Sequence, residues 1–206
     1  MGYDIYGLNP KQLVEKPQLL TDLLDKDGCT NYDVYEKLSK EEQENYWKVR
    51  QEHEDSNPGI YFRNNIWWWR PLWNYVCEVC EEVMSDDDIE AGQSNSGDII
   101  NAETVDHMIT KLNSEIMLRR HVDYEIAYNI RIGELPLMDC DYCDGTGTRH
   151  WDDGPQDCNV CNTEYTRKEG IPVGKEKSWE SRYPFSAENV EEFVKFLEHS
   201  GGIQIS

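Results

Sequence analysis

Four cysteines in two close pairs constrain the fold of this chain more than any other feature of its sequence. Two residues separate Cys140 from Cys143 and Cys158 from Cys161, and fourteen residues separate the two pairs. A Cys-x-x-Cys turn places two thiolates on one side of a tight loop, and two such turns supply the four soft ligands of a tetrahedral zinc ion. Because the segment is polar and rich in glycine, it needs an ion to order it. The spacing predicts a closed, structural Zn²⁺ site formed by these four residues.

The first cysteine pair also resembles a known zinc-binding segment. Residues 140–147 read Cys-Asp-Tyr-Cys-Asp-Gly-Thr-Gly and resemble the Cys-x-x-Cys-x-Gly-x-Gly repeat of the DnaJ-type cysteine-rich zinc domain. The second pair lacks the following Gly-x-Gly, two pairs are present where that domain has four, and no His-Pro-Asp signature occurs. The resemblance therefore implies a zinc knuckle and does not imply chaperone activity.

A second resemblance covers most of the chain outside residues 11–57. The opening at residues 3–10, the stretch 61–73 and the ending at 183–202 are similar to a family of uncharacterised phage and bacterial proteins. No activity is known for that family, so the resemblance implies a phage context and assigns no catalytic residue.

The remaining cysteines have weaker patterns. Cys77 and Cys80 repeat the metal spacing but also fall on an apolar helical stripe, and core packing is the favoured interpretation. A metal at this pair would need His107 or His121 as a further ligand. Cys29 stands alone in a turn. Seven cysteines without a secretion signal are typical of a reducing cytoplasm, and we expect a cytoplasmic protein.

Apolar periodicity predicts an α+β, mainly helical fold with an aromatic-rich core. Short strands at 3–8 and 203–205 are expected to pair with each other. Residues 85–98 are rich in Asp, Ser, Gly and Asn, and we expect a mobile acidic loop there. Helices are expected over five ranges: 17–24, 40–53, 71–84, 102–132 and 187–200.

The predicted organisation has three segments. A helical main body covers 1–137 and carries a charged helical excursion at about 11–57. The zinc knuckle covers 138–166 as an irregular loop. A C-terminal helix and strand at 167–206 complete the main body.

The net charge of the chain limits the kinds of molecule that it is expected to bind. The chain has 41 acidic and 20 basic side chains, a formal net charge of -21. Such a surface repels the phosphate backbone of nucleic acids and anionic membranes, and attracts proteins with a basic surface. Residues 77–106 hold ten acidic side chains and no Lys or Arg. The candidate partner-binding residues combine acidic and aromatic groups: Asp86, Asp87, Asp88, Glu90, Trp67, Trp68 and Arg70.

The sequence contains no recognised catalytic motif, and this favours a protein that is not an enzyme. The sequence predicts a zinc-stabilised acidic protein that acts by binding a protein partner. Together with the phage resemblance, this implies an accessory protein that modulates a host protein in the host cytoplasm. The more specific hypothesis is that the chain acts as a DNA mimic. Two alternatives stay open: a metal-assisted hydrolase or nuclease, and a structural or assembly component.

Overall fold

The computed structural model describes residues 2–24 and 30–206. These residues form a mainly helical α+β protein, which confirms the predicted fold class. They divide into two compact units, Met1–His121 with Ala187–Ser206, and Val122–Ser186. The predicted knuckle lies inside the second unit, and the segment boundaries drawn from the sequence stay a prediction. Cys29 lies outside the described residues, as does Gly28, the first glycine after the predicted helix at 17–24.

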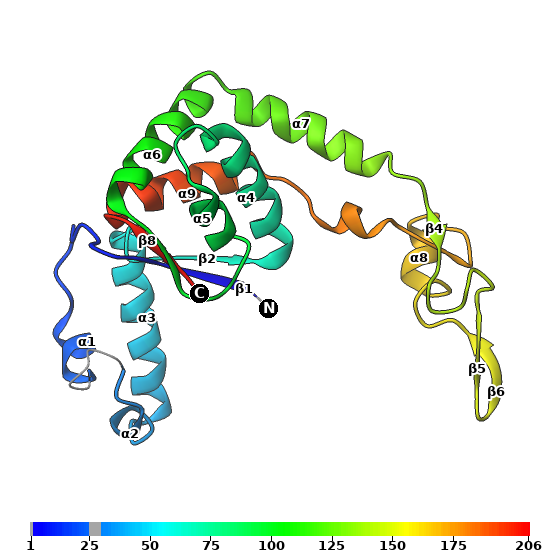
Figure 1. The fold of residues 1–206 in the computed structure, drawn as a ribbon. Coiled ribbons are helices and arrows are strands. Elements are labelled where there is room, and N and C mark those ends of the chain that lie inside the picture. The colour runs from blue at the N-terminus through cyan, green and yellow to red at the C-terminus, as the bar shows by residue number, and fades with distance from the viewer. Residues whose placement is uncertain (1, 25–29) are drawn as a thin grey trace. The chain divides into compact units, whose positions relative to one another are not determined.

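The first unit is built on an antiparallel sheet with the strand order β2-β1-β8-β3 (Figure 1). Its strands are β1 (Gly2–Gly7), β2 (Tyr61–Asn65), β3 (Asp98–Ile100) and β8 (Ile203–Ile205). The expected pairing of the chain ends is confirmed, because Ile5 lies opposite Ile205 in neighbouring strands. Alternate side chains of β1 and β8 are buried, as a sheet covered on one face requires.

Three helices build the aromatic core over this sheet. They are α4 (Ile66–Cys80), α6 (Ala102–Met117) and α9 (Ala187–Ser200). The helices α4 and α9 contact β1 and β2, and α6 packs on both helices. The fully buried ring of Trp69 stacks on Tyr3 and on Trp73, with centroid distances of 5.2 and 5.3 Å. Its Nε1 donates to the Gly92 carbonyl at 2.7 Å, which satisfies the buried indole N–H.

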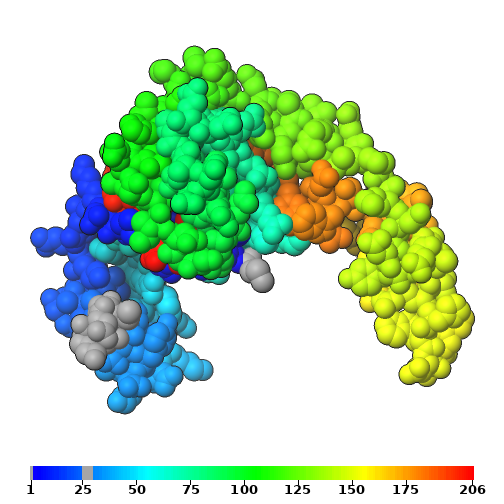
Figure 2. Space-filling model, in the orientation of Figure 1, coloured from blue at the N-terminus to red at the C-terminus, as the bar shows by residue number. Residues whose placement is uncertain are grey.

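A separate cluster joins three helices near the N-terminus. They are α1 (Gln18–Asp22), α2 (Tyr32–Tyr35) and α3 (Lys40–Ser56), drawn in blue to cyan in Figure 2. The predicted helix at 40–53 begins with a capping box, since the side chains of Ser39 and Glu42 each accept a hydrogen bond from the other's backbone N–H. Leu20, Leu23 and Tyr46 form the buried centre of this cluster.

The prediction of a mobile acidic loop at 85–98 is wrong. Ser85 begins a short helix, α5 (Asp86–Ala91), and the Asp88 carboxylate accepts the Ser85 N–H at 2.9 Å. The acidic side chains of the first turn lie at the positive end of the helix dipole, which favours them there. Residues 98–100 then join the sheet as β3.

The predicted continuous helix over 102–132 is also wrong. It is broken into α6 and α7 (Arg120–Gly133) at Arg119, whose φ of 57° lies in the left-handed region. Beyond the break, His121 is buried and its Nε2 lies 3.0 Å from Oε1 of Glu191 on α9. No Gly or Pro lies at the break between α6 and α7. The contact of His121 with a residue far along the chain follows directly after it.

The start of α4 differs from its prediction at Pro71. The helix begins five residues earlier, because the Asn65 side chain accepts the N–H groups of Trp67 and Trp68. Pro71 therefore lies inside the helix. Trp67 and Trp68 remain partly exposed, while Trp69 turns into the core.

The second unit contains short elements. After α7 come β4 (Met138–Asp139), β5 (Thr148–Trp151), β6 (Gly154–Asp157), α8 (Glu164–Lys168), β7 (Lys175–Glu176) and a 3₁₀ helix, Trp179–Arg182. The strand β4 pairs with β7, and β5 pairs with β6. Asn129 on α7 exchanges two hydrogen bonds with the backbone of Phe185, at 3.0 and 3.1 Å. Among the described residues, no helix combines the length and apolarity needed to cross a membrane.

Candidate metal centre

Four cysteine side chains converge in the second unit. The Sγ atoms of Cys140, Cys143, Cys158 and Cys161 all lie within 4.8 Å of one another, and all four residues are buried. The Sγ–Sγ distance is 3.9 Å between Cys140 and Cys158. It is 3.5 Å between Cys143 and Cys161. Disulfide sulfurs lie about 2.05 Å apart, whereas two ligands of a tetrahedral zinc ion, each about 2.3 Å from the metal, lie roughly 3.8 Å apart. The cluster therefore has the spacing of a metal site.

The first cysteine turn is shaped by backbone in the left-handed region. Asp144, Gly145 and Gly147 have φ values of 49°, 75° and 76°. The N–H groups of Cys143 and Gly145 both donate to the Cys140 carbonyl at 3.2 Å. The Gly147 N–H then donates to Cys143 Sγ at 3.2 Å. Glycine at 145 and 147 allows this tight backbone beside the cysteines, because it adopts positive φ without a steric penalty.

The second turn is attached directly to the first. The Cys158 N–H donates to the Gly147 carbonyl at 2.9 Å. After Cys161, Thr163 caps α8, and the Thr166 hydroxyl donates a hydrogen bond to the Cys161 carbonyl at 3.1 Å. The short helix thus holds the backbone beside the last cysteine.

Sequence reasoning missed Gly174, which closes the site from a distant segment. Its carbonyl accepts the Cys140 N–H at 2.9 Å, and its φ is 85°. A Cβ atom on Gly174 would lie 2.0 Å from the Gly145 carbonyl oxygen. Gly174 follows Pro172 and Val173, and nothing in this local sequence predicts that it packs on the cysteine turn.

The thiols do not ionise equally. Burial raises the pKa of Cys140 to about 12. Burial also opposes ionisation of Cys158, but hydrogen bonds from the N–H groups of Cys161 and Val160 and from the thiols of Cys161 and Cys143 together outweigh it and lower the pKa of Cys158 to about 7. The protein dipoles alone therefore do not stabilise four thiolates side by side. A divalent cation bound here would supply the missing charge and leave a formal charge of about -2.

The hairpin beside the cysteines uses its one basic side chain internally. Arg149 lies 4.5 Å from the ring centroid of Trp151 and 5.5 Å from that of Tyr142. Its Nη1 also donates to Asn159 at 2.9 Å. Trp151 on the hairpin and Tyr142 on the first cysteine turn are both exposed, so the Arg149 guanidinium joins two exposed aromatic rings.

The other candidate ligands are not part of the cluster. Cys80 is fully buried in α4, as core packing predicts, and burial raises the pKa of Cys77 to about 11. His150, a histidine between the two cysteine pairs, lies exposed on β5, and His121 contacts Glu191. Within residues 2–24 and 30–206, the four cysteines are the only group of three or more potential ligands that could hold a metal ion.

The seven candidate partner-binding residues lie in the first unit. Trp67, Trp68 and Arg70 are exposed on the first turns of α4, and Asp86, Asp87 and Glu90 are exposed on α5. Asp88 is engaged in the cap of α5 through Ser85. The two helices are joined by a hydrogen bond from Trp73 Nε1 to the Ile89 carbonyl at 3.0 Å. Their binding role stays a prediction.

The fold thus brings together a small cluster of four buried thiols that could hold a metal ion. Comparison with protein-family models, with curated proteins and with solved structures gave no match to this chain. The function of the chain is therefore inferred from the geometry of its metal centre and the charge of its surface.

Proposed function

We propose that this chain is a zinc-stabilised protein-binding protein whose partner has a basic surface. The supporting observation is the closed set of four buried thiols, which leaves no protein-built opening for a catalytic water. A metal held in this way orders the surrounding chain instead of acting on a substrate. The hydrolase alternative has no second ligand cluster among the described residues to support it.

The second unit has an acidic net charge, as the whole chain does. Residues 122–186 contain thirteen acidic and seven basic side chains. Three of the acidic residues lie on the β5–β6 hairpin, where Arg149 is already stacked on two rings. Figure 1 shows this hairpin, β5 and β6, at one end of the second unit. A basic protein surface complements these carboxylates, whereas a phosphate backbone does not.

The phage-accessory role and the DNA mimicry belong to the same proposal. The first has its support in the sequence resemblance, and the second in the excess of carboxylates. Mimicry predicts that the partner normally binds nucleic acid, and that duplex DNA competes with this chain for it.

Capture from a bacterial lysate followed by a salt titration tests the proposal. We expect a basic protein to be retained at low salt and released as the ionic strength rises, because exposed charge pairs are screened. Capture that persists unchanged at high salt would contradict it.

A matched pair of charge-reversal variants tests the predicted face. Asp86→Lys with Asp87→Lys should weaken capture, while Glu41→Lys with Glu44→Lys makes the same charge change on exposed positions of α3 and should retain more of it. Equal loss from both variants would show that only the net charge matters and would remove the α5 assignment.

A further inference from the structure

A pocket in the first unit is lined by none of the metal ligands and none of the predicted partner-binding residues. Its volume is about 450 Å³, and its walls come from β1, the segment before α1, α1 itself and α3. This is within the range of sites that hold small organic molecules, roughly 300–1,000 Å³.

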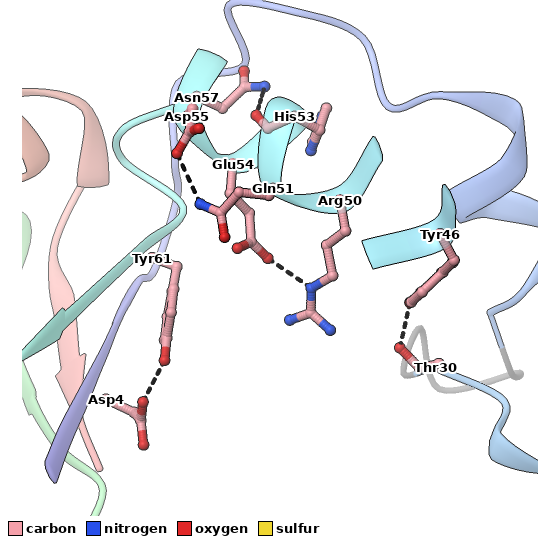
Figure 3. Close-up of polar contacts among 10 residues, drawn as sticks. All are labelled: Asp4, Thr30, Tyr46, Arg50, Gln51, His53, Glu54, Asp55, Asn57 and Tyr61. Carbon is pink, nitrogen blue, oxygen red and sulfur yellow. Dashed lines mark hydrogen bonds and ion pairs between the residues drawn. The ribbon is translucent and has the colours of Figure 1, made fainter. Parts of the chain in front are cut away.

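The described part of the pocket wall has more basic than acidic groups, although the chain has twice as many acidic as basic residues. Among the described residues, Lys16, Arg50 and His53 line the pocket together with one carboxylate, that of Glu54. In the described part of the chain, Lys16 has no ion-pair partner. Glu54 accepts from Arg50 Nε at 2.7 Å, as Figure 3 shows. The guanidinium has further N–H donors on its Nη atoms.

His53 supplies a second, independent observation. Its side chain is 6% exposed, and its Nε2 is buried without a hydrogen-bond partner among the described residues. Buried polar atoms in folded proteins nearly always have a partner, and one that lacks a protein partner commonly meets a ligand or an ordered water. A ligand oxygen at this wall provides the missing partner.

Aromatic and aliphatic side chains form the rest of the pocket. Tyr46 is 2% exposed, and its hydroxyl shares a 2.8 Å hydrogen bond with Thr30 (Figure 3). Tyr6 is 43% exposed, and its ring packs against Tyr61 at a centroid distance of 5.2 Å. Leu20 and Ile60 add apolar surface. Such walls suit a flat, apolar ligand body.

The fully buried side chain of Asn57 fixes the geometry of these walls. Its Oδ1 accepts the N–H groups of Leu13 and Val14 at 2.7 and 3.0 Å. Its Nδ2 donates to the carbonyls of Val14 and His53 at 3.2 and 2.8 Å. The segment that carries Lys16 is therefore tied to the end of α3 that carries His53. A site held by such bonds is organised before a ligand arrives.

We propose that this pocket binds a small organic anion. A carboxylate or phosphate group is held by Lys16, Arg50 and His53, and a flat apolar body lies against Tyr6 and Tyr46. This assignment is independent of the proposed protein-binding function.

Nuclear magnetic resonance titration with defined probes tests the site. The probes are 1-naphthyl phosphate, 1-naphthoate, neutral 1-naphthol and inorganic phosphate. We expect one or both naphthyl anions to shift the imidazole resonances of His53 saturably. Naphthol and inorganic phosphate should bind at least about tenfold more weakly, because each lacks one half of the recognised chemistry. The stronger of the two naphthyl anions identifies the acidic group. Equal binding of all four probes, or no shift at His53, would overturn the proposal.

Two charge-matched variants separate the pocket from general electrostatics. Lys16→Gln should weaken the stronger naphthyl anion about tenfold, because a charge-assisted hydrogen bond is lost. Lys195→Gln removes the same charge from a neighbouring groove and should leave the affinity unchanged. Lys16 is exposed, so its replacement leaves the buried core intact. Equal weakening by both variants, or none by Lys16→Gln, would count against the site.

Discussion

Replacing Asn57 with alanine tests how the N-terminal segment is held to α3. The side chain makes four hydrogen bonds, to backbone groups of Leu13, Val14 and His53, and is fully buried. A typical hydrogen bond contributes about 0.5–1.5 kcal/mol net, so four bonds amount to about 2–6 kcal/mol. Leu13 and Val14 are each 48% exposed, and water replaces some of the bonds they lose. We expect Asn57→Ala to lower the free energy of unfolding by about 2–4 kcal/mol.

Urea denaturation and amide hydrogen exchange measure this effect. The midpoint of unfolding of Asn57→Ala should fall, and the amides of Leu13 and Val14 should exchange as fast as those of an unstructured peptide. Asn113→Ala is the control, because that side chain makes one exposed bond, to Glu198 at 2.9 Å, and should change stability by less than about 0.5 kcal/mol. If Asn57→Ala matched the control and both amides stayed protected, the assigned bonds would not hold the segment.

Three further perturbations have defined outcomes. Cys161→Ser should abolish stoichiometric zinc binding and the ordered amide spectrum of the second unit, while leaving the first unit folded, since the cysteines form the buried cluster there; a spectrum unchanged in the second unit would refute this. Gly174→Ala should weaken zinc binding by competition assay, whereas Gly170→Ala, also at positive φ but facing open space, should leave it near the wild-type value; equal affinities would remove the role of the close backbone contact. Burial and the hydrogen bond to Asp4 raise the pKa of Tyr61 above its ordinary value. Because the folded pKa is raised, this stabilisation is complete below the unfolded pKa of about 10 and is lost as the pH rises through the folded value. Tyr61→Phe should therefore flatten the fall of the urea midpoint above pH 10, and an unchanged slope would contradict the assignment.

Local signals in the sequence predicted several elements correctly. The helix predicted from residue 40 does begin there as α3, because its capping box of Ser39 and Glu42 depends only on residues within one helical turn. The alternation at the two chain ends marked β1 and β8. The spacing of the cysteine pairs indicated the metal centre, whose four sulfurs the fold brings together.

Features that depend on distant contacts escaped the sequence. The break at Arg119 carries no Gly or Pro, and the contact of buried His121 with the exposed carboxylate of Glu191 joins residues 70 positions apart. Gly174 contacts the first cysteine turn from a distant part of the chain, so its role cannot be predicted from the residues next to it in the sequence. The helix α5 was missed for a different reason. Its acidic composition is typical of a loop, but the cap formed by Ser85 and Asp88 stabilises a helix.

Metal analysis combined with X-ray absorption tests the central claim most directly. The protein purified without added metal should contain about one zinc ion per chain, surrounded by four sulfur atoms at about 2.3 Å. That result would establish the closed tetrathiol centre formed by Cys140, Cys143, Cys158 and Cys161. A second unit that is fully folded without metal, or a zinc ion bound by oxygen or nitrogen atoms, would contradict it.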